Sequence, residues 1–120
     1  MRFHHLGMLF QTSALAARVA QERFGAFPQH WERVEAFHCL CVFLEPQYPM
    51  LELVVPDYGS RLAAYLTQSI TALHHLAFEL DETERPLEPL LFDTWAQGAR
   101  GLLVNFGSPH DGLLIEYVRR

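Results

Sequence analysis

The sequence contains no lysine, and all nine of its basic side chains are arginines. Chemistry that needs a lysine amine, such as a Schiff base or the phosphate-binding lysine of a P-loop, is therefore excluded. The arginines are scattered, and acidic residues outnumber them to give a formal net charge of -5. Because nucleic acids are bound through clustered positive charge, we expect no nucleic-acid partner.

Cysteines are few, and long apolar runs are missing. The two cysteines, Cys39 and Cys41, lie two residues apart in a strand-like segment, so we expect reduced core residues rather than a disulfide. No apolar run of about 18 residues is present, and Met1 leads directly into strand-like sequence without a signal peptide. We therefore expect a cytoplasmic protein that has no membrane partner.

Residues 3–10 (FHHLGMLF) have a near copy at residues 73–80 (LHHLAFEL). Side chains alternate between the two faces of a strand, so one face of each copy is apolar and the other carries one histidine. On the histidine face, His5 is followed by Gly7, and His75 is followed by Ala77. The small neighbours leave room above the sheet for a metal ion and a ligand. Two copies of one strand indicate two copies of one module.

The remaining elements follow the same order in each half. Thr12 and Ser13 are typical N-caps of a helix that ends at Gly25, and residues 31–44 predict one strand or two joined by a bend near Ala36. Residues 50–55 predict a strand that contains Glu52. Apolar residues at helical spacing then predict a linking helix over 58–70.

In the second half, residues 81–96 contain two prolines, Pro86 and Pro89, so we expect no long helix there. Strands follow at 101–106 and 112–118, and the last contains Glu116. We expect a single domain over 1–120, in which module one spans 1–57, the linking helix 58–70, and module two 71–120. The shortened second half leaves apolar faces and edges that a twofold partner can cover, so we predict a homodimer.

Each half carries one carboxylate in an apolar strand, Glu52 and Glu116. A buried carboxylate must be paired, protonated or metal-bound. If the modules pair by pseudo-twofold symmetry, these residues meet His5 and His75 in one cleft. Two imidazoles and two carboxylates suit one divalent ion of zinc, iron, manganese, cobalt or nickel, whereas two imidazoles disfavour calcium.

This pattern resembles the vicinal oxygen chelate superfamily, which includes glyoxalase I, extradiol dioxygenases, methylmalonyl-CoA epimerase and bleomycin- and fosfomycin-resistance proteins. The resemblance is greatest to methylmalonyl-CoA epimerase-like proteins. It is carried by five segments, namely 5–7 (HLG), 43–44 (FL), 52–56 (ELVVP), 60–80 and 112–116 (GLLIE).

The resemblance implies an α+β fold of paired βαβββ modules that form a curled, cup-shaped mixed sheet. The prolines in 81–96 predict a truncated helix in the second module, which departs from the family pattern. The resemblance also implies metal ligands at His5, Glu52, His75 and Glu116, while His4 and His74 lie behind the ligands or in the core. The family's chemistry removes a proton alpha to a carbonyl group, which makes the protein an isomerase or lyase. Candidate bases are Glu116 and Glu32. Glu32 is close in sequence to the position at which the epimerases carry a further glutamate, at the start of their second strand.

A second reading assigns the protein to the resistance branch of the same fold. There the cup binds a small molecule without catalysis, and its aromatic side chains supply the contacts. Both readings imply a small-molecule ligand, and the sequence does not identify it.

Overall fold

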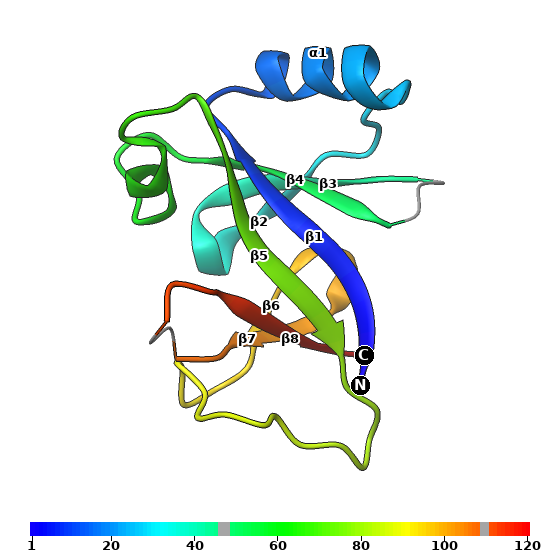
Figure 1. Ribbon diagram of the computed structural model, residues 1–120, viewed down its shortest axis with the longest axis vertical. Helices are drawn as coiled ribbons and strands as arrows, with labels where there is room; N and C mark the ends of the chain where they lie inside the picture. Colours follow the sequence, from blue (N-terminus) through cyan, green and yellow to red (C-terminus); the bar gives the residue numbers. More distant parts are fainter. Residues whose placement is uncertain (46–48, 109–110) are drawn as a thin grey trace.

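The structure is a computed structural model that describes residues 1–45, 49–108 and 111–120. Eight strands form one mixed sheet in the order β2-β3-β4-β1-β5-β8-β7-β6, which curls into a cup (Figure 1). The strands are β1 (Arg2–Phe10), β2 (Glu32–Val34), β3 (Cys39–Leu44), β4 (Leu51–Pro56), β5 (Thr71–Glu79), β6 (Ala96–Gln97), β7 (Leu103–Phe106) and β8 (Ile115–Arg119). The expected α+β cup of two similar halves is confirmed.

The two repeated strands, β1 and β5, lie antiparallel at the centre of the sheet (Figure 1). On their outer sides, β1 pairs with β4 and β5 pairs with β8, both in parallel. The register at the centre is symmetrical, because His5 lies opposite Ala77 and Gly7 lies opposite His75. A pseudo-twofold axis therefore passes between Leu6 and Leu76, which are also partners.

The helix α1 (Ser13–Phe24) covers the outer face of the first half. The hydroxyl of Thr12 accepts a hydrogen bond from the backbone N–H of Leu15, and Gly25 ends the helix with a φ of 64°. Ala16 and Ala20 on α1 are fully buried against apolar residues of β1, β3 and β4. Alternation along the strands leaves the opposite face of the same sheet for the inside of the cup.

No helix lies between β5 and β6, as the two prolines predict. The segment between these strands covers the outer face of the second half instead. The side chain of Asn105 on β7 exchanges two hydrogen bonds with the backbone of Phe92, and the Tyr117 hydroxyl on β8 donates to Glu88. These contacts satisfy buried polar groups that a helix would otherwise cover.

The linking helix expected over 58–70 is wrong in length and type. The structure contains one 3-10 helix there, η2 (Leu62–Leu66). Its three apolar residues at positions i, i+3 and i+4 need only one such turn to bring Leu62 and Leu66 against the core. The sequence also gave no signal for β6, because two residues are too few for an alternating pattern. Within the described ranges, no helix is both long and apolar enough to cross a membrane.

The bend predicted near Ala36 is confirmed and forms the 3-10 helix η1 (Glu35–Phe37) between β2 and β3. A third 3-10 helix, η3 (Ala99–Gly101), connects β6 to β7. Both lie along the open edges of the sheet, and η3 contacts β2, so that the two edges approach each other and close the cup.

Candidate metal centre

Two rows of paired residues cross the centre of the sheet, one from each half. The first row is Phe43, Glu52, Gly7 and His75, and the second is Phe106, Glu116, Ala77 and His5. In each row, a small residue separates the glutamate of one strand from the histidine of the other repeat. All these side chains point to the same face because directly paired residues share a face of the sheet.

The small residues make room for the imidazoles. A Cβ atom added to Gly7 would lie only 2.0 Å from Cε1 of His75 and 2.4 Å from its Nε2. The space expected above Gly7 is therefore filled by the histidine of the other repeat, which reaches across Gly7 toward Glu52. Ala77 occupies the equivalent place beside His5 and is fully buried.

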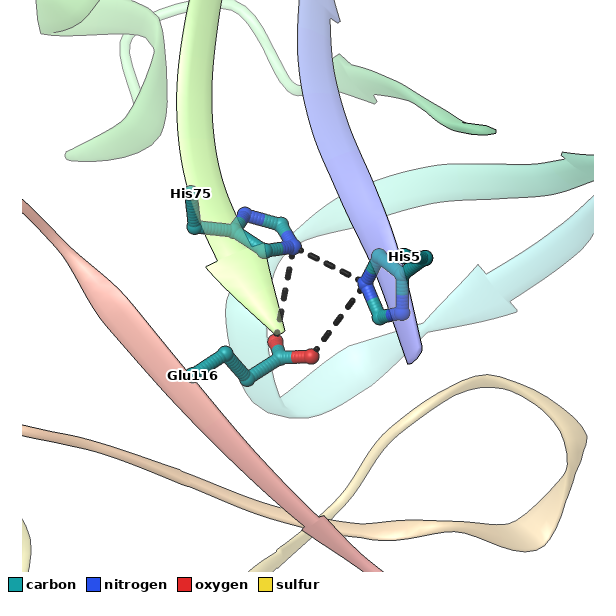
Figure 2. A group of neighbouring side chains, drawn as sticks. All are labelled: His5, His75 and Glu116. Atoms are coloured by element: carbon teal, nitrogen blue, oxygen red, sulfur yellow. Dashed lines mark hydrogen bonds and ion pairs between the residues drawn. The ribbon is translucent and has the colours of Figure 1, made fainter. Parts of the chain in front are cut away.

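The four predicted ligand residues converge. His5 Nε2 lies 3.0 Å from His75 Nε2, 3.3 Å from Glu52 Oε1 and 3.4 Å from Glu116 Oε1. His75 Nε2 lies 3.4 Å from Glu52 Oε1 and 3.8 Å from Glu116 Oε2. Ligand atoms of His5, His75 and Glu116 all lie within 4.8 Å of one another (Figure 2). Each carboxylate thus contacts both imidazoles, and none of the four residues is more than 7% exposed.

This donor set fits a divalent transition metal. Two ligand atoms that each lie about 2.1 Å from one ion, at angles of about 90–110°, are about 3.0–3.4 Å apart. The three separations among His5 Nε2, His75 Nε2 and Glu52 Oε1 are 3.0–3.4 Å and fall in that range. Glu116 approaches the two imidazoles through different oxygens, Oε1 at 3.4 Å from His5 and Oε2 at 3.8 Å from His75. Two nitrogen and two oxygen donors leave coordination positions for oxygen atoms of a substrate.

The charges of the cluster are divided unequally between the two carboxylates. Burial raises the pKa of the Glu52 carboxyl, but hydrogen bonds from His5 and His75 outweigh it, so this pKa lies below its usual range. Burial and the nearby charge of Glu52 raise the pKa of the Glu116 carboxyl well above its usual value. Burial also lowers the pKa of His75. An ionised carboxylate and a neutral imidazole are the forms that bind a cation.

The preceding histidine contacts each of these imidazoles from behind. His4 Nδ1 lies 2.7 Å from His5 Nδ1, and His74 Nδ1 lies 2.8 Å from His75 Nδ1. If Nε2 of His75 is kept free for a metal, its proton is on Nδ1 and is donated to His74. His74 then carries its own proton at Nε2, a buried atom without a hydrogen-bond partner among the described residues. Burial and the proximity of His75 lower the pKa of His74 to about 4, so its ring is neutral.

Glu32, the other candidate base, lies outside the cluster. Its carboxylate accepts a hydrogen bond from the backbone N–H of Arg100, at 2.9 and 3.1 Å from its two oxygens. It is also absent from the described residues that line the cavity. β2 is an edge strand, and Glu32 accepts from the amide of Arg100 in η3, so it joins the two edges of the cup.

A cavity of about 540 Å³ opens above the cluster, a size suited to a small organic molecule. Its floor holds the four clustered residues, and the rings of Phe43 and Phe106 lie 5.1 Å and 6.0 Å from those of His5 and His75. Cys39 and Cys41 are buried free thiols in the wall, as expected, with their sulfur atoms 3.6 Å apart. The rest of the wall is mainly apolar.

Sequence reasoning missed two residues of the cavity. Phe106 is the symmetry equivalent of Phe43, because it pairs with Glu116 as Phe43 pairs with Glu52. The repeat of the two halves was the signal that could have found it. Arg61 on the wall had no local signal, because the turn that presents it was predicted as a regular helix.

No protein-family model matches the chain, and no curated protein matches it in sequence. Solved structures do match it over nearly its whole length. Methylmalonyl-CoA epimerase from Mycobacterium tuberculosis is 21% identical, with a TM-score of 0.81 over 98% of this chain and 87% of that one. A variant of the Streptomyces coelicolor epimerase, in complex with 2-nitronate-propionyl-CoA, is 21% identical, with a TM-score of 0.83 over 99% and 96%. A hypothetical protein from Bacillus halodurans is 18% identical, with a TM-score of 0.79 over 99% and 94%.

These likenesses establish the fold, which is that of methylmalonyl-CoA epimerases and hence the vicinal oxygen chelate fold expected from the sequence. At such identities the fold alone is shared, so the activity has to be argued from the site.

Proposed function

We propose that the protein is a divalent-metal-dependent isomerase or lyase that removes a proton alpha to a carbonyl group. The observation that supports this proposal is the convergence of two imidazole nitrogens and two buried carboxylates at the floor of a cavity. The similar structures include methylmalonyl-CoA epimerases, and one of them was solved in complex with methylmalonyl-CoA.

His5, Glu52, His75 and Glu116 would hold the metal, which we propose to be zinc, cobalt, nickel, manganese or iron. Such an ion supplies a Lewis acid that draws electrons from a substrate carbonyl and so acidifies the neighbouring C–H bond. The buried position of these residues excludes water, which strengthens electrostatic interactions at the reacting atoms.

Among the two candidate bases we assign the proton transfer to Glu116. Glu116 lies in the cluster at the floor of the cavity, whereas the carboxylate of Glu32 accepts a hydrogen bond from the Arg100 amide and does not line the described cavity wall. The proton of the substrate moves to a carboxylate oxygen of Glu116, and the electron pair of the C–H bond stays on the substrate as an enolate. Transfer of the proton from Glu116 to a neighbouring carbon, or protonation of the opposite face of the alpha carbon while Glu116 releases its proton to solvent, completes an isomerisation. Loss of a neighbouring group completes an elimination.

The test is hydrogen exchange at the alpha carbon. The protein is loaded with zinc or cobalt and incubated in D₂O with methylmalonyl-CoA, propionyl-CoA and hemithioacetals, and the loss of the alpha-proton signal is followed by NMR. We expect exchange that a chelator abolishes and that added metal restores. Absence of exchange over the whole panel, in protein that has bound metal, would contradict the proposed reaction.

Two neighbouring histidines provide a matched control for the same experiment. Replacing His75 by Ala removes a ligand and should lower metal affinity by several orders of magnitude. Replacing His74 by Ala removes only the group behind it, and such a loss typically costs 10–100-fold. Metal content after dialysis distinguishes the two, and equal losses would show that His75 is not a ligand.

A second candidate function is a binding protein that sequesters a small molecule in the cavity. The engagement of Glu32 with Arg100 favours it, because it removes one of two candidate bases from the cavity. This function predicts ligand binding that survives chelation together with an absence of alpha-proton exchange. The cytoplasmic location also stays a prediction.

A further inference from the structure

The mouth of the cavity differs from its floor. The floor residues His5, Glu52, His75 and Glu116 are buried, whereas Arg61 and Tyr65 of the turn that contains η2, Leu91 and Phe92 are exposed and line the same cavity. The exposed fractions of Tyr65, Leu91 and Phe92 are 58%, 47% and 40%, so the mouth is a largely apolar surface in contact with solvent.

Arg61 is the only arginine among the described residues that line the cavity. Some other arginines of the described chain are in ion pairs, such as Arg33 with Asp57 and Arg100 with Glu45, or stack on an aromatic ring, as Arg119 does on Trp95. The rest, Arg18, Arg23 and Arg85, do not line the described cavity wall. Within the described ranges, no ion pair joins Arg61 to an acidic residue. Its guanidinium group is therefore available to a ligand at the mouth.

The wall next to Arg61 has further unused hydrogen-bonding capacity. Tyr65, four residues after Arg61, packs edge-on against His74 with ring centroids 5.0 Å apart. His74 Nε2 is buried and has no partner within the described ranges. Buried polar groups are normally satisfied, so the wall next to Arg61 contains one unsatisfied polar atom.

The charge balance of the cavity points to an anion. A divalent cation at the floor would cancel the charges of Glu52 and Glu116, which are the only acidic residues that line the described wall. Arg61 then leaves the cavity with one positive charge. A guanidinium group binds a carboxylate or a phosphate through two parallel hydrogen bonds, which makes this contact specific for an oxyanion.

We propose that the ligand is a small acid with two oxygen atoms for the metal, an apolar middle and one carboxylate or phosphate group that Arg61 binds at the mouth. The inference rests on the proposed function, because the cluster has to hold the other end of the ligand. A coenzyme A thioester matches less well, since its several phosphate charges would meet a single arginine on the described wall.

The test uses the zinc-loaded full chain and four matched hydroxamates, which chelate zinc through two oxygens. Benzohydroxamate has no second charge. Its 4-carboxy and 4-phosphono derivatives add an anion, and the 4-carbamoyl derivative adds a neutral group of similar shape. Calorimetry should show the carboxy compound binding about tenfold more tightly than the carbamoyl compound, which corresponds to about 1.4 kcal/mol. The phosphono compound shows which oxyanion Arg61 prefers.

Three variants assign the preference to Arg61. We expect Arg61→Gln to reduce the carboxy-to-carbamoyl ratio to about one and Arg61→Lys to retain part of it, while benzohydroxamate binds equally to all. Arg18→Gln removes the same charge from the outside of α1 and should change nothing. A ratio that is unchanged in Arg61→Gln would overturn the inference, as would displacement of the carboxy compound by coenzyme A at micromolar concentration.

Failure of the metal-dependent function would look different. In that case benzohydroxamate would not bind the zinc-treated protein at all. The role of Arg61 would then be decided in metal-free protein with benzoate and benzamide, observed by NMR. Tighter binding of benzoate by the wild type alone would support the role, and equal binding by the wild type and Arg61→Gln would overturn it.

Discussion

The candidate metal centre depends on two residues without polar side chains, Gly7 and Ala77. Gly7 and Ala77 lie at equivalent points of the two repeats, each between a glutamate and a histidine of its row. The ring of His75 occupies the position that a side chain at residue 7 would take. A glycine at this position is thus needed for close approach and not for its backbone conformation, since its φ is not in the left-handed region.

We predict that Gly7→Ala weakens metal binding by at least a hundredfold. The added Cβ would overlap the imidazole of His75, which must swing away from the cluster. The fold should survive, because the clash involves a side chain and not the backbone. Zinc affinity from calorimetry and the circular dichroism spectrum measure the two effects.

Ala77→Gly is the matched control at the equivalent position. It removes a methyl group instead of adding one, so we expect zinc affinity to change by less than a few fold. Its cost should be a loss of stability of about 1 kcal/mol, because glycine is unfavourable in a strand. Equal zinc affinities for Gly7→Ala and the wild type would show that His75 does not bind the metal in this position.

Among the structural elements, the short ones at the two edges of the sheet define the cavity. β2 and η3 belong to different halves, and the hydrogen bond from the Arg100 amide to Glu32 connects them. The same Arg100 extends its guanidinium over the ring of Phe43, 4.7 Å from the centroid, and Phe43 in turn packs on His5. The edges are therefore coupled to the floor of the site through one arginine.

We predict that Glu32→Ala lowers the free energy of unfolding by about 1 kcal/mol, since a partly exposed charge-assisted hydrogen bond is lost. Zinc affinity should remain within a few fold of the wild type. Denaturation in urea and calorimetry measure these two quantities. Glu35→Ala removes an exposed carboxylate next to the same strand and should be close to neutral for stability.

A different result for Glu32→Ala would make Glu32 a catalytic residue instead of a structural one. Loss of alpha-proton exchange in Glu32→Ala without any change in stability would make Glu32 the base, as the sequence allowed. Glu116 would then act as a ligand alone.

On the scale of the whole molecule, apolar side chains remain on the outside of the sheet. Phe3 and Phe78 pack against each other on the outer side of β1 and β5, and Phe3 is 40% exposed. Leu73 on β5 and Leu87 in the following segment are 71% and 84% exposed. We expect a partner subunit to cover some of these exposed side chains.

The homodimer expected from the sequence therefore stays a prediction for the protein in solution. Light scattering at micromolar concentration should give twice the chain mass of 13.8 kDa. The value should not change when metal is removed, because the four clustered residues belong to one chain. A monomer mass would contradict the prediction and leave the exposed leucines without a partner.

Features that depend on local periodicity could be predicted from the residues alone. Alternation along two similar strands placed His5 and His75 opposite the apolar faces. Glu52 and Glu116 stood out as single carboxylates in apolar strands. The capping residues predicted the helix α1 in the first half. The two prolines after β5 predicted that the second half has no equivalent helix. Each of these signals lies within a few residues of what it determines.

Features that depend on contacts between distant segments required the folded structure. The register of β1 with β5 brings His75 over Gly7, 68 residues away along the chain. The contact of β2 with η3 removes Glu32 from the cavity, and one turn of 3-10 helix presents Arg61 to it. Such contacts leave no periodic trace in the sequence, because each depends on how the sheet curls and on which edges then meet.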